Sequence, residues 1–564
     1  MGIRDTFAKK PEKLVLRFRR ELEKLAYWTS EGINKEEREI FHPDDIKKFW
    51  TEAYDDGDSR LKILCKTLFE KDYETAMGDI RDRRLRVLSV MVYCDWRDWD
   101  KFKSMVQYPL LRTGTVTNEA LPLKRTNIPV YLGCDEITSR HFERNQWAFI
   151  PIIIGPNNTL DSERYRPPFL ASHLEEIGSG AFSTVMKVTI PGKFLAPGVR
   201  GSTQEDALFR FAWKKFTSGR PGDFVRELQN LKKLENSRHD NIMDSVADLT
   251  YGQEAGILFP LAVCSLHELL LSDSERGRTI REKILGAPNA LQDILCEMSK
   301  LAEAIYHLHQ NIKGESRRHH EGVHGDLHLK NIVIATEPTE KAPAGEWKVI
   351  DFGLSIIREE AVPRAGYMSI MPQETIYASG LYPPPEIVMS TGKKAISPKN
   401  DVYSFGCILA STLAFLLGGQ PGALEFENMK EGPFFDIKGG KAVRKIEVDR
   451  WLEDMTSRFG KEHPWISQTV DIINKCTKSK PERRLHSKEL SDKLDSTVYA
   501  LPRNAQPPVW DPKQPRIVSP TRGLPVLIAR PPFHISRPEL RRQSGSKESG
   551  SSNPQTFESF SSTA

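Results

Sequence analysis

The feature that most constrains this chain is an ordered series of short glycine-bearing and charged motifs between residues 177 and 484. The first motif, IGSGAFSTV at 177–185, is typical of a glycine-rich turn between two predicted strands. Glycines in such a turn let the backbone approach phosphate groups without a Cβ clash. Two glycines in a hairpin are usually only a hairpin, so this motif is informative only together with those that follow it.

Two charged residues come next, at the spacing of a strand and a helix. Lys214 ends the strand-like run 211–214, and Glu227 lies on the polar face of a predicted helix at 224–231. A buried lysine that binds phosphates needs a carboxylate to keep it charged and in place. We therefore expect these two side chains to meet; the alternative is that both are solvated surface charges.

Polar loops and one strongly apolar segment complete the series. HGDLHLKN at 324–331 and WKVIDFG at 347–353 lie beside apolar strands, and YPPPE, DVYSFG and PERR begin at residues 382, 401 and 481. The apolar run Cys407–Leu417 is shorter than the ~20 residues that a bilayer requires, so it predicts a buried helix. Ser397 is the expected N-cap of that helix and Pro398 its first residue.

In this order the motifs resemble those of the eukaryotic protein kinase family, over roughly residues 169–497. The resemblance implies an α+β fold of two lobes, a small β lobe over a helical lobe, with ATP between them. It implies an ATP-dependent enzyme that transfers the γ-phosphate to a Ser/Thr hydroxyl of a protein substrate.

The resemblance also implies a role for each motif residue. Asp326 would be the catalytic base, Lys214 would hold the α- and β-phosphates and pair with Glu227, and Asn331 and Asp351 would hold Mg²⁺. The structural residues would be the ion pair Glu386–Arg484 and Asp401, which braces the catalytic loop. The ATP site would comprise Gly178, Gly180, Ser183, Val185, Ala212, Lys214, Phe259, Ala262 and Val333.

Three positions bear on regulation and acceptor choice. Gly325 replaces the arginine that normally pairs with a phosphate on the activation segment, so control by such a phosphate is not expected. His328 stands where serine/threonine kinases place a lysine. Ser379 takes the place of the hydroxyl that braces Asp326, which favours a Ser/Thr acceptor.

Two other functions fit part of the pattern. The loop at 324–331 also resembles that of small-molecule phosphotransferases, although those lack the motifs at 382–386 and 401–406. A pseudokinase scaffold, which binds partners without catalysis, is the other alternative, and the departures at Gly325 and His328 keep it open.

The remaining chain divides by composition. Residues 1–156 are expected to form a mostly helical domain with an unknown partner, because Leu14, Phe18, Leu22 and Leu25 recur at helical spacing. Residues 157–168, polar with a double proline, are predicted to be a linker. Residues 501–564 are rich in proline and then in serine, and are predicted to be a disordered tail.

Charge and cysteine content limit the partners and the location. The chain carries 81 Lys+Arg and 76 Asp+Glu, so it lacks the strongly basic balance of a nucleic-acid binder. None of its seven cysteines forms a C-x-x-C pair, which indicates an intracellular, cytoplasmic protein. No transmembrane segment is expected, and Gly2 with Thr6 matches the myristoylation pattern by chance rather than as a membrane anchor.

Overall fold

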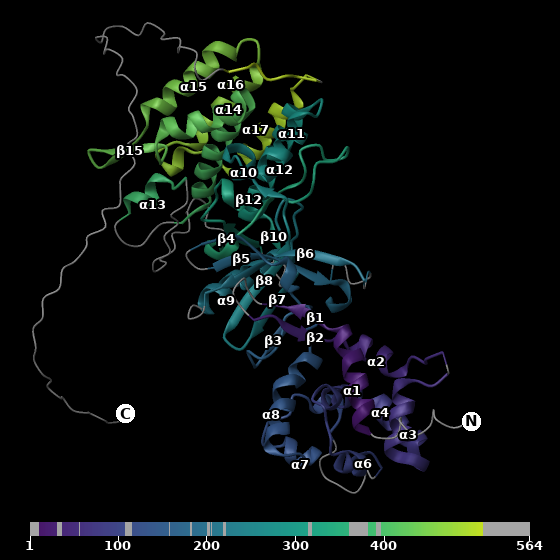
Figure 1. Cartoon of the computed structure of the whole chain (residues 1–564). Helices are drawn as coiled ribbons and strands as arrows, with labels where there is room; N and C mark the ends of the chain where they lie inside the picture. Colours follow the sequence, from purple (N-terminus) through teal and green to yellow (C-terminus); the bar gives the residue numbers. More distant parts are fainter. Residues whose placement is uncertain are drawn as a thin grey trace, which may run out of the picture. The chain divides into compact units, whose positions relative to one another are not determined.

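The structure, a computed structural model, describes most of the first 510 residues. These belong to one compact unit, Met1–Gln514 (Figure 1). The described residues are 11–30, 36–55, 57–107, 116–156, 158–180, 183–199, 204, 206–217, 221–313, 319–359, 382–390, 396–502 and 504–510.

The N-terminal part is helical, as its hydrophobic spacing predicts. Large aromatic side chains, among them Phe18, Trp50, Trp96 and Phe102, are fully buried in its core. A short antiparallel hairpin pairs β1 (Tyr27–Thr29) with β2 (Arg38–Ile40). The helices are α1 (Pro11–Leu22), α2 (Pro43–Thr51), α3 (Arg60–Phe69), α4 (Tyr73–Arg83), α5 (Leu85–Tyr93), α6 (Asp100–Gln107), α7 (Ile128–Leu132) and α8 (Glu136–Asn145).

A six-stranded sheet with one helix forms the small lobe. The strand order is β3-β7-β8-β6-β5-β4, antiparallel except for the parallel pair β3–β7. Helix α9 (Pro221–Glu235) is the next element after β6 and buries two polar side chains, Glu227 and Asn230. The strands are β3 (Asn158–Leu160), β4 (Glu175–Ser179), β5 (Ser183–Pro191), β6 (Leu208–Phe216), β7 (Ala247–Tyr251) and β8 (Glu254–Pro260).

The predicted linker, residues 157–168, is not simply a connector. Strand β3 lies inside it and pairs with β7, with Asn158 opposite Leu249 and Leu160 opposite Tyr251. Backbone hydrogen bonds hold this pairing and do not depend on apolar side chains, so composition alone did not indicate it. The strand covers an edge of β7 that would otherwise be unpaired.

The N-terminal part and the small lobe share a hydrophobic core. Ile40, Ile152 and Ile154 pack in the same cluster as Val188 and Phe194 of the small lobe. The backbone N–H of Ile154 donates to the Phe194 carbonyl at 2.8 Å. The two parts are therefore continuous in their packing.

An ion pair also connects the N-terminal part to the small lobe, at the edge of the shared core. The ammonium of Lys193 lies 2.9 Å from the Asp45 carboxylate at the start of α2, and both side chains are mostly buried. The Tyr27 and Phe194 rings meet edge to face with centroids 5.2 Å apart. Polar and aromatic contacts thus add to the shared core.

The large lobe is helical and is centred on α14 (Pro398–Lys430), with Ser397 at its N-terminus as expected. Of the described helices only α14 is long and apolar enough to span a membrane, and 89% of its most apolar window is buried in the protein, as in a core helix. The chain kinks at Gly419, where φ is +61°. The other helices are α10 (Leu266–Leu271), α11 (Glu275–Leu285), α12 (Ala290–Gln310), α13 (Pro385–Met389), α15 (Ile446–Phe459), α16 (Pro464–Cys476) and α17 (Ser487–Tyr499).

Short strands carry the loops of the cleft. One three-stranded sheet has the order β13-β12-β9. A second sheet, of order β10-β11-β14, pairs the chain before residue 324 with the chain after residue 355. The strands are β9 (Cys264–Ser265), β10 (Ile312–Lys313), β11 (His319–Val323), β12 (Ile332–Ile334), β13 (Trp347–Val349), β14 (Ile356–Glu359), β15 (Phe435–Lys438) and β16 (Lys441–Arg444).

The predicted tail, residues 501–564, begins too early. Leu501 and Trp510 are each 7% exposed and pack in the core of the large lobe. Prolines and small residues around these two side chains concealed the contact in the sequence. Residues 511–564 lie outside the described part of the chain.

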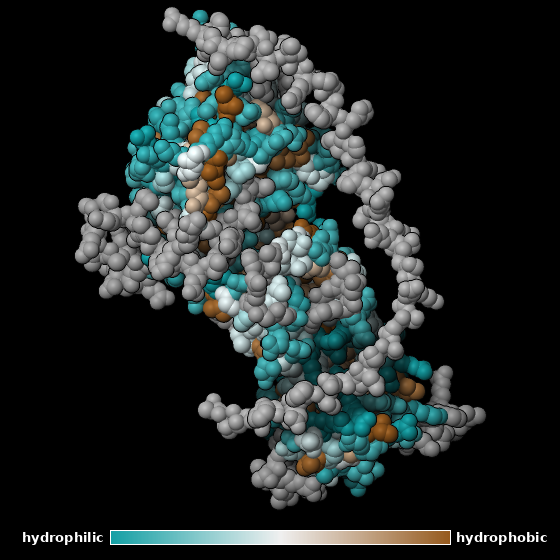
Figure 2. All heavy atoms as spheres, turned by 90° about the vertical axis from the view of Figure 1, so that its left-hand side faces the viewer, coloured by the Kyte–Doolittle hydropathy of each residue, from teal (hydrophilic) through white to brown (hydrophobic). Residues whose placement is uncertain are grey.

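The described surface is mainly hydrophilic on the face seen in Figure 2, with apolar residues in scattered patches. The larger exposed apolar side chains include Ile437, Val443 and Ile446, on or just after the hairpin β15–β16. Scattered apolar residues of this kind are normal on a folded surface.

Candidate active site

Three predicted residues from separate elements meet around one ammonium group. The Nζ of Lys214, on β6, lies 2.8 and 2.7 Å from the two carboxylate oxygens of Glu227, on α9. It also lies 2.8 Å from Oδ1 of Asp351. Lys214 is 8% and Glu227 1% exposed, so these are not solvated surface charges.

Electrostatics keep this group charged. Burial alone would lower the pKa of Lys214, but the carboxylates of Glu227 and Asp351 outweigh it and raise that pKa. Burial likewise opposes ionisation of Asp351, but Lys214 outweighs it and lowers the pKa of Asp351. Lys214 and Asp351 are therefore held as a cation and an anion at neutral pH.

Helix α9 is tied directly to the segment that follows Asp351. The Asn230 side-chain amide donates to the carbonyls of Phe352 at 2.9 Å and Ser355 at 2.8 Å. Arg226 donates to the Gly353 carbonyl at 2.9 Å. These contacts place Glu227 and Asp351 on one framework, because the helix cannot shift without breaking them.

Sequence reasoning missed Asn230. Its signal was available, since Asn230 lies three residues after Glu227 and so on the same helix face, where a buried polar side chain calls for a partner.

The catalytic loop is braced by Asp401, as the resemblance implies. Its carboxylate accepts hydrogen bonds from the backbone N–H groups of His324 at 2.7 Å and Gly325 at 2.9 Å, and from His309 Nε2 at 3.0 Å. Asp401 is 1% exposed. Sequence reasoning missed His309, which the last turn of α12 supplies.

Gly325 meets a local backbone requirement. Its φ is +81°, a region that side-chain-bearing residues rarely adopt, and an added Cβ would lie 3.1 Å from the Leu354 carbonyl oxygen. The loop therefore favours glycine at the position where the kinase motif pattern implies an arginine. Ser379, the predicted brace of Asp326, lies outside the described residues.

One oxygen of the Asp326 carboxylate has no hydrogen-bond donor in the part of the chain that the structure describes. Its side chain is 19% exposed, and the buried Oδ1 has no hydrogen-bond partner among the described residues. His328 Nε2 lies 3.6 Å from Oδ2. A carboxylate oxygen without a donor is suited to accept a proton from an incoming hydroxyl.

The oxygens near Asp326 suit a magnesium ion. The Asn331 amide N–H donates to the Asp326 carbonyl at 2.9 Å, which leaves its own side-chain oxygen for another group. Lys214 and the Gly353 N–H both contact Oδ1 of Asp351, and no described residue donates to Oδ2.

The described residues contain no group of three or more His, Cys, Asp or Glu side chains able to hold a metal by themselves. Mg²⁺ commonly uses one or two protein ligands with substrate phosphates, so Asn331 and Asp351 fit it.

The predicted ATP residues line up on adjacent elements. Val185 pairs with Lys214 across β5 and β6, and Ala212 pairs with Phe259 across β6 and β8. The glycine turn closes with a hydrogen bond of 2.8 Å from the Gly180 N–H to the Ser183 carbonyl.

The two residues at the tip of this turn, 181 and 182, are outside the described part of the chain. Gly178, Gly180 and Ser183 lie on the turn or beside it, Ala262 follows the end of β8, and Val333 lies on β12.

The predicted ion pair of the large lobe is present and bidentate. Arg484 donates to both oxygens of Glu386 at 2.7 Å, and the Asn400 amide adds a bond of 2.6 Å. Arg484 is 3% exposed. This pair joins α13 to the turn before α17, and Asn400 joins α13 to α14.

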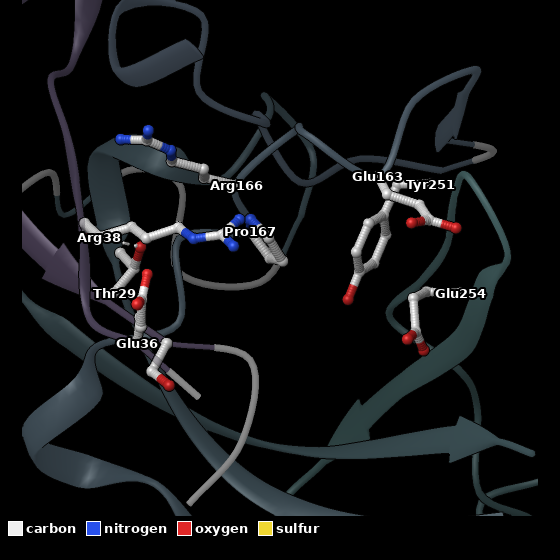
Figure 3. Close-up of a pocket in the computed structure, with 9 residues that line it drawn as sticks. Thr29, Glu36, Arg38, Glu163, Arg166, Pro167, Tyr251 and Glu254 are labelled. Carbon is white, nitrogen blue, oxygen red and sulfur yellow. Dashed lines mark hydrogen bonds between the residues drawn. The ribbon is translucent and has the colours of Figure 1, made fainter. Parts of the chain in front are cut away.

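A cavity of 330 Å³ lies at the junction between the N-terminal part and the small lobe, away from these residues. In Figure 3 the Arg38 and Tyr251 side chains point toward its centre. Two arginines and three glutamates line it, so its charge favours no one sign of ligand. Its lining is Thr29, Ser30, Glu36, Arg38, Glu163, Arg166, Pro167, Tyr251 and Glu254.

The sequence is similar to known proteins over the region that contains these residues. Residues 171–494 match the protein kinase domain. The chain is 25% identical over 390 residues to the ovarian-specific serine/threonine-protein kinase Lok of Drosophila melanogaster, covering 66% of each chain. It is 26% identical over 289 residues to cyclin-dependent kinase G-2 of Oryza sativa subsp. indica, covering 48% of this chain and 35% of that protein.

A third relative is the serine/threonine-protein kinase crk1 of Schizosaccharomyces pombe, 28% identical over 212 residues, with 37% of this chain and 52% of that protein covered. The chain thus spans between 35% and 66% of the length of these relatives. The domain match covers more than half of the chain and every motif from Gly178 to Arg484. The chain belongs to the protein kinase family.

Proposed function

We propose that this chain transfers the γ-phosphate of ATP to a Ser/Thr hydroxyl of a protein substrate. The observation that carries the proposal is the single ammonium of Lys214 within 2.8 Å of both Glu227 and Asp351. Both the lysine–glutamate pair and the metal-binding aspartate must be in place for a kinase to act, and here they are in contact.

Each residue has a distinct task in this mechanism. Asp326 accepts the proton of the acceptor hydroxyl through its unpartnered oxygen. Lys214, oriented by Glu227, binds the α- and β-phosphates. Asp401 keeps the loop that carries Asp326 in position through its bonds to the loop backbone.

Magnesium would be held by Asn331 and Asp351. When bound, the ion supplies positive charge that neutralises the phosphate oxygens. The Lys214 ammonium, 2.8 Å from Asp351, keeps that carboxylate ionised and so able to bind a cation.

A protein acceptor with a Ser/Thr hydroxyl is supported by two observations. The structure has the anchoring pair Glu386–Arg484 and the brace Asp401, which the sequence pattern of small-molecule phosphotransferases lacks. Two of the three relatives are named serine/threonine-protein kinases. We further propose an intracellular location, and a catalytic domain within roughly residues 169–497.

Substitution of the charge cluster tests the function. We expect Lys214→Met and Asp351→Asn each to lower kcat for phosphate transfer to a Ser/Thr peptide by at least about a hundredfold, because each removes charge that the transition state requires. Lys215→Met is the matched control, since Lys215 pairs with Glu254 outside the cluster.

Other outcomes identify the alternatives. A wild-type protein that binds Mg·ATP but transfers no phosphate to any acceptor would support a pseudokinase scaffold. Transfer to small alcohols but not to peptides would support a small-molecule phosphotransferase. Normal turnover in both variants would contradict the assigned residues.

A further inference from the structure

The last described residues close onto the large lobe in a specific way. The backbone N–H of Trp510 donates to the Leu417 carbonyl at 2.8 Å, and the residue is 7% exposed. A Cβ on Gly418 would come within 2.9 Å of the indole, and one on Gly422 within 3.1 Å. Two glycines of α14 therefore leave the space that this side chain occupies.

Trp510 is the end of a row of five buried aromatic rings. Successive centroids are 5.7 Å apart for Trp510–Trp451, 4.6 Å for Trp451–Phe426, 5.8 Å for Phe426–Phe434 and 6.1 Å for Phe434–Tyr382. We call these five residues the aromatic row. Protein interiors are close-packed, so a ring in such a row cannot shift without moving its neighbour.

The other end of the row, Tyr382, is fixed by polar contacts as well. Its hydroxyl donates to Glu427 Oε1 at 2.9 Å, and its carbonyl accepts from Ser404 Oγ at 3.0 Å. Lys430 pairs with Glu427 at 2.8 Å and lies 5.2 Å from the centre of the Tyr382 ring. Tyr382 thus enters the lobe at a fixed point, four residues before Glu386.

The described chain resumes at Tyr382, after residue 359. In a kinase the segment between Asp351 and Glu386 controls access of the acceptor. Tyr382 lies at the C-terminal end of that segment, and its contacts fix this end to the large lobe.

We propose that Trp510 is a positioning residue for the protein acceptor, acting through the aromatic row on Tyr382. The inference rests on the proposed kinase function. The predicted ATP residues lie on the small lobe and on β12, and none belongs to the row. Loss of the indole should therefore weaken use of the acceptor while use of ATP is retained.

Steady-state kinetics of the full chain test this. We expect Trp510→Ala to raise KM for a Ser/Thr peptide by about threefold or more, a typical size for a coupling through packed residues, with KM for ATP unchanged. Val509→Ala is the matched control, because Val509 is the adjacent residue and is 86% exposed. An equal change in both KM values, or none, would overturn the proposal.

Two further variants separate positioning from simple loss of stability. Trp510→Phe keeps a ring in the row and should restore most of the peptide KM, whereas Gly418→Ala should reproduce the defect because its Cβ meets the indole. Trp510→Ala combined with Phe434→Leu should be less than additive, since both interrupt the same row. Additive effects would contradict a shared route.

Hydrogen exchange distinguishes failure of this inference from failure of the proposed function. It requires no turnover, so it applies even if the protein transfers no phosphate. We expect Trp510→Ala to speed exchange of the backbone amides within 382–390, where 383–385 are prolines without an N–H, but not of those in α9. Unchanged exchange at 382–390 would contradict the positioning role whatever the activity.

Discussion

Asp401 shows how one buried side chain organises a catalytic loop. It accepts bonds from His309 and from two successive backbone N–H groups, those of His324 and Gly325. Burial alone would raise the pKa of Asp401, but His309 and His324 outweigh it and hold that pKa below its ordinary value of 3.8. The aspartate therefore stabilises the fold above that value, and the contribution is lost as the pH falls below it.

Asp401→Asn should separate charge from shape at this position. An amide would turn an NH₂ donor toward N–H donors, so we expect the free energy of unfolding to fall by about 1.5–3 kcal/mol. We also expect kcat to fall, because the loop that carries Asp326 loses its brace. Urea unfolding and initial rates measure the two effects.

Asp492→Asn is the control for this substitution. Asp492 pairs with Lys488 on the surface of α17, where an ion pair contributes little. A loss of stability as large in the control as in Asp401→Asn would show that the charge itself, rather than the brace, matters. Asp401→Asn should also lose less stability than the wild type as the pH falls below the ordinary aspartate pKa of 3.8, because it has no carboxylate to protonate.

Single residues of the site were predictable where a motif names the chemistry. Lys214 and Glu227 meet as the order of the motifs predicts, whereas the contact of Lys214 with Asp351 was not predicted. His309 was not predicted, because a lone polar residue in an amphipathic helix gives no sign of a partner more than ninety residues away in the sequence. Asn230 was overlooked, although it lies on the same helix face as Glu227. The roles of the individual residues in catalysis stay predictions.

At the scale of elements, α9 and the segment after Asp351 behave as one piece. The Asn230 amide bridges two carbonyls of that segment, and Lys233 Nζ donates to a third, that of Ile357, at 2.8 Å. Helix α9 thus carries both the partner of Lys214 and the contacts that fix the segment after Asp351.

Asn230→Ala should loosen this connection. Two buried carbonyls would lose their donor, so we expect stability to fall by about 1–3 kcal/mol and kcat to fall with it. The neighbouring Gln229→Ala, on the exposed side of α9, is the control. If kcat stays unchanged in Asn230→Ala while stability falls, the amide supports folding only.

Elements were predictable where hydrophobic periodicity is strong. Helices α1 and α14 follow their apolar patterns, and Ser397 precedes α14 as expected. Strand β3 and the contact of Trp510 were not predicted, since each depends on a partner distant in sequence rather than on local composition. The segments at 157–168 and 501–510 were accordingly misread as linker and tail.

Across the whole molecule, all seven cysteines are free thiols with raised pKa values. Burial raises the pKa of Cys65, Cys94, Cys264 and Cys476 to about 12, and that of Cys134 to about 11. Burial also raises the pKa of Cys296 and Cys407. The thiolate is the reactive form, so little of it is present near neutral pH.

We therefore expect the folded protein to react slowly with iodoacetamide at neutral pH and all seven cysteines to react after unfolding in urea. Mass spectrometry of the alkylated protein with and without urea gives the count. Rapid alkylation of any one cysteine in the native protein would show that its side chain opens to solvent.

The shared core at the junction predicts how fragments behave. A chain starting at residue 169 would lack Ile40, Ile152 and Ile154, and would expose Val188 and Phe194. We expect it to melt well below the chain 11–510, or to aggregate, because exposed apolar surface of this kind promotes association. A thermal melt of both fragments measures this, and equal melting temperatures would contradict the shared core.

That junction also bears on how such a protein diverges. Side chains of the N-terminal part and of the small lobe fill the same volume around Phe194, so a larger residue on one side requires a smaller one on the other. Substitutions in the core of either part are therefore constrained by the residues of the other part. The N-terminal part and the small lobe are expected to be inherited together and to change in step, rather than to be exchanged separately between lineages.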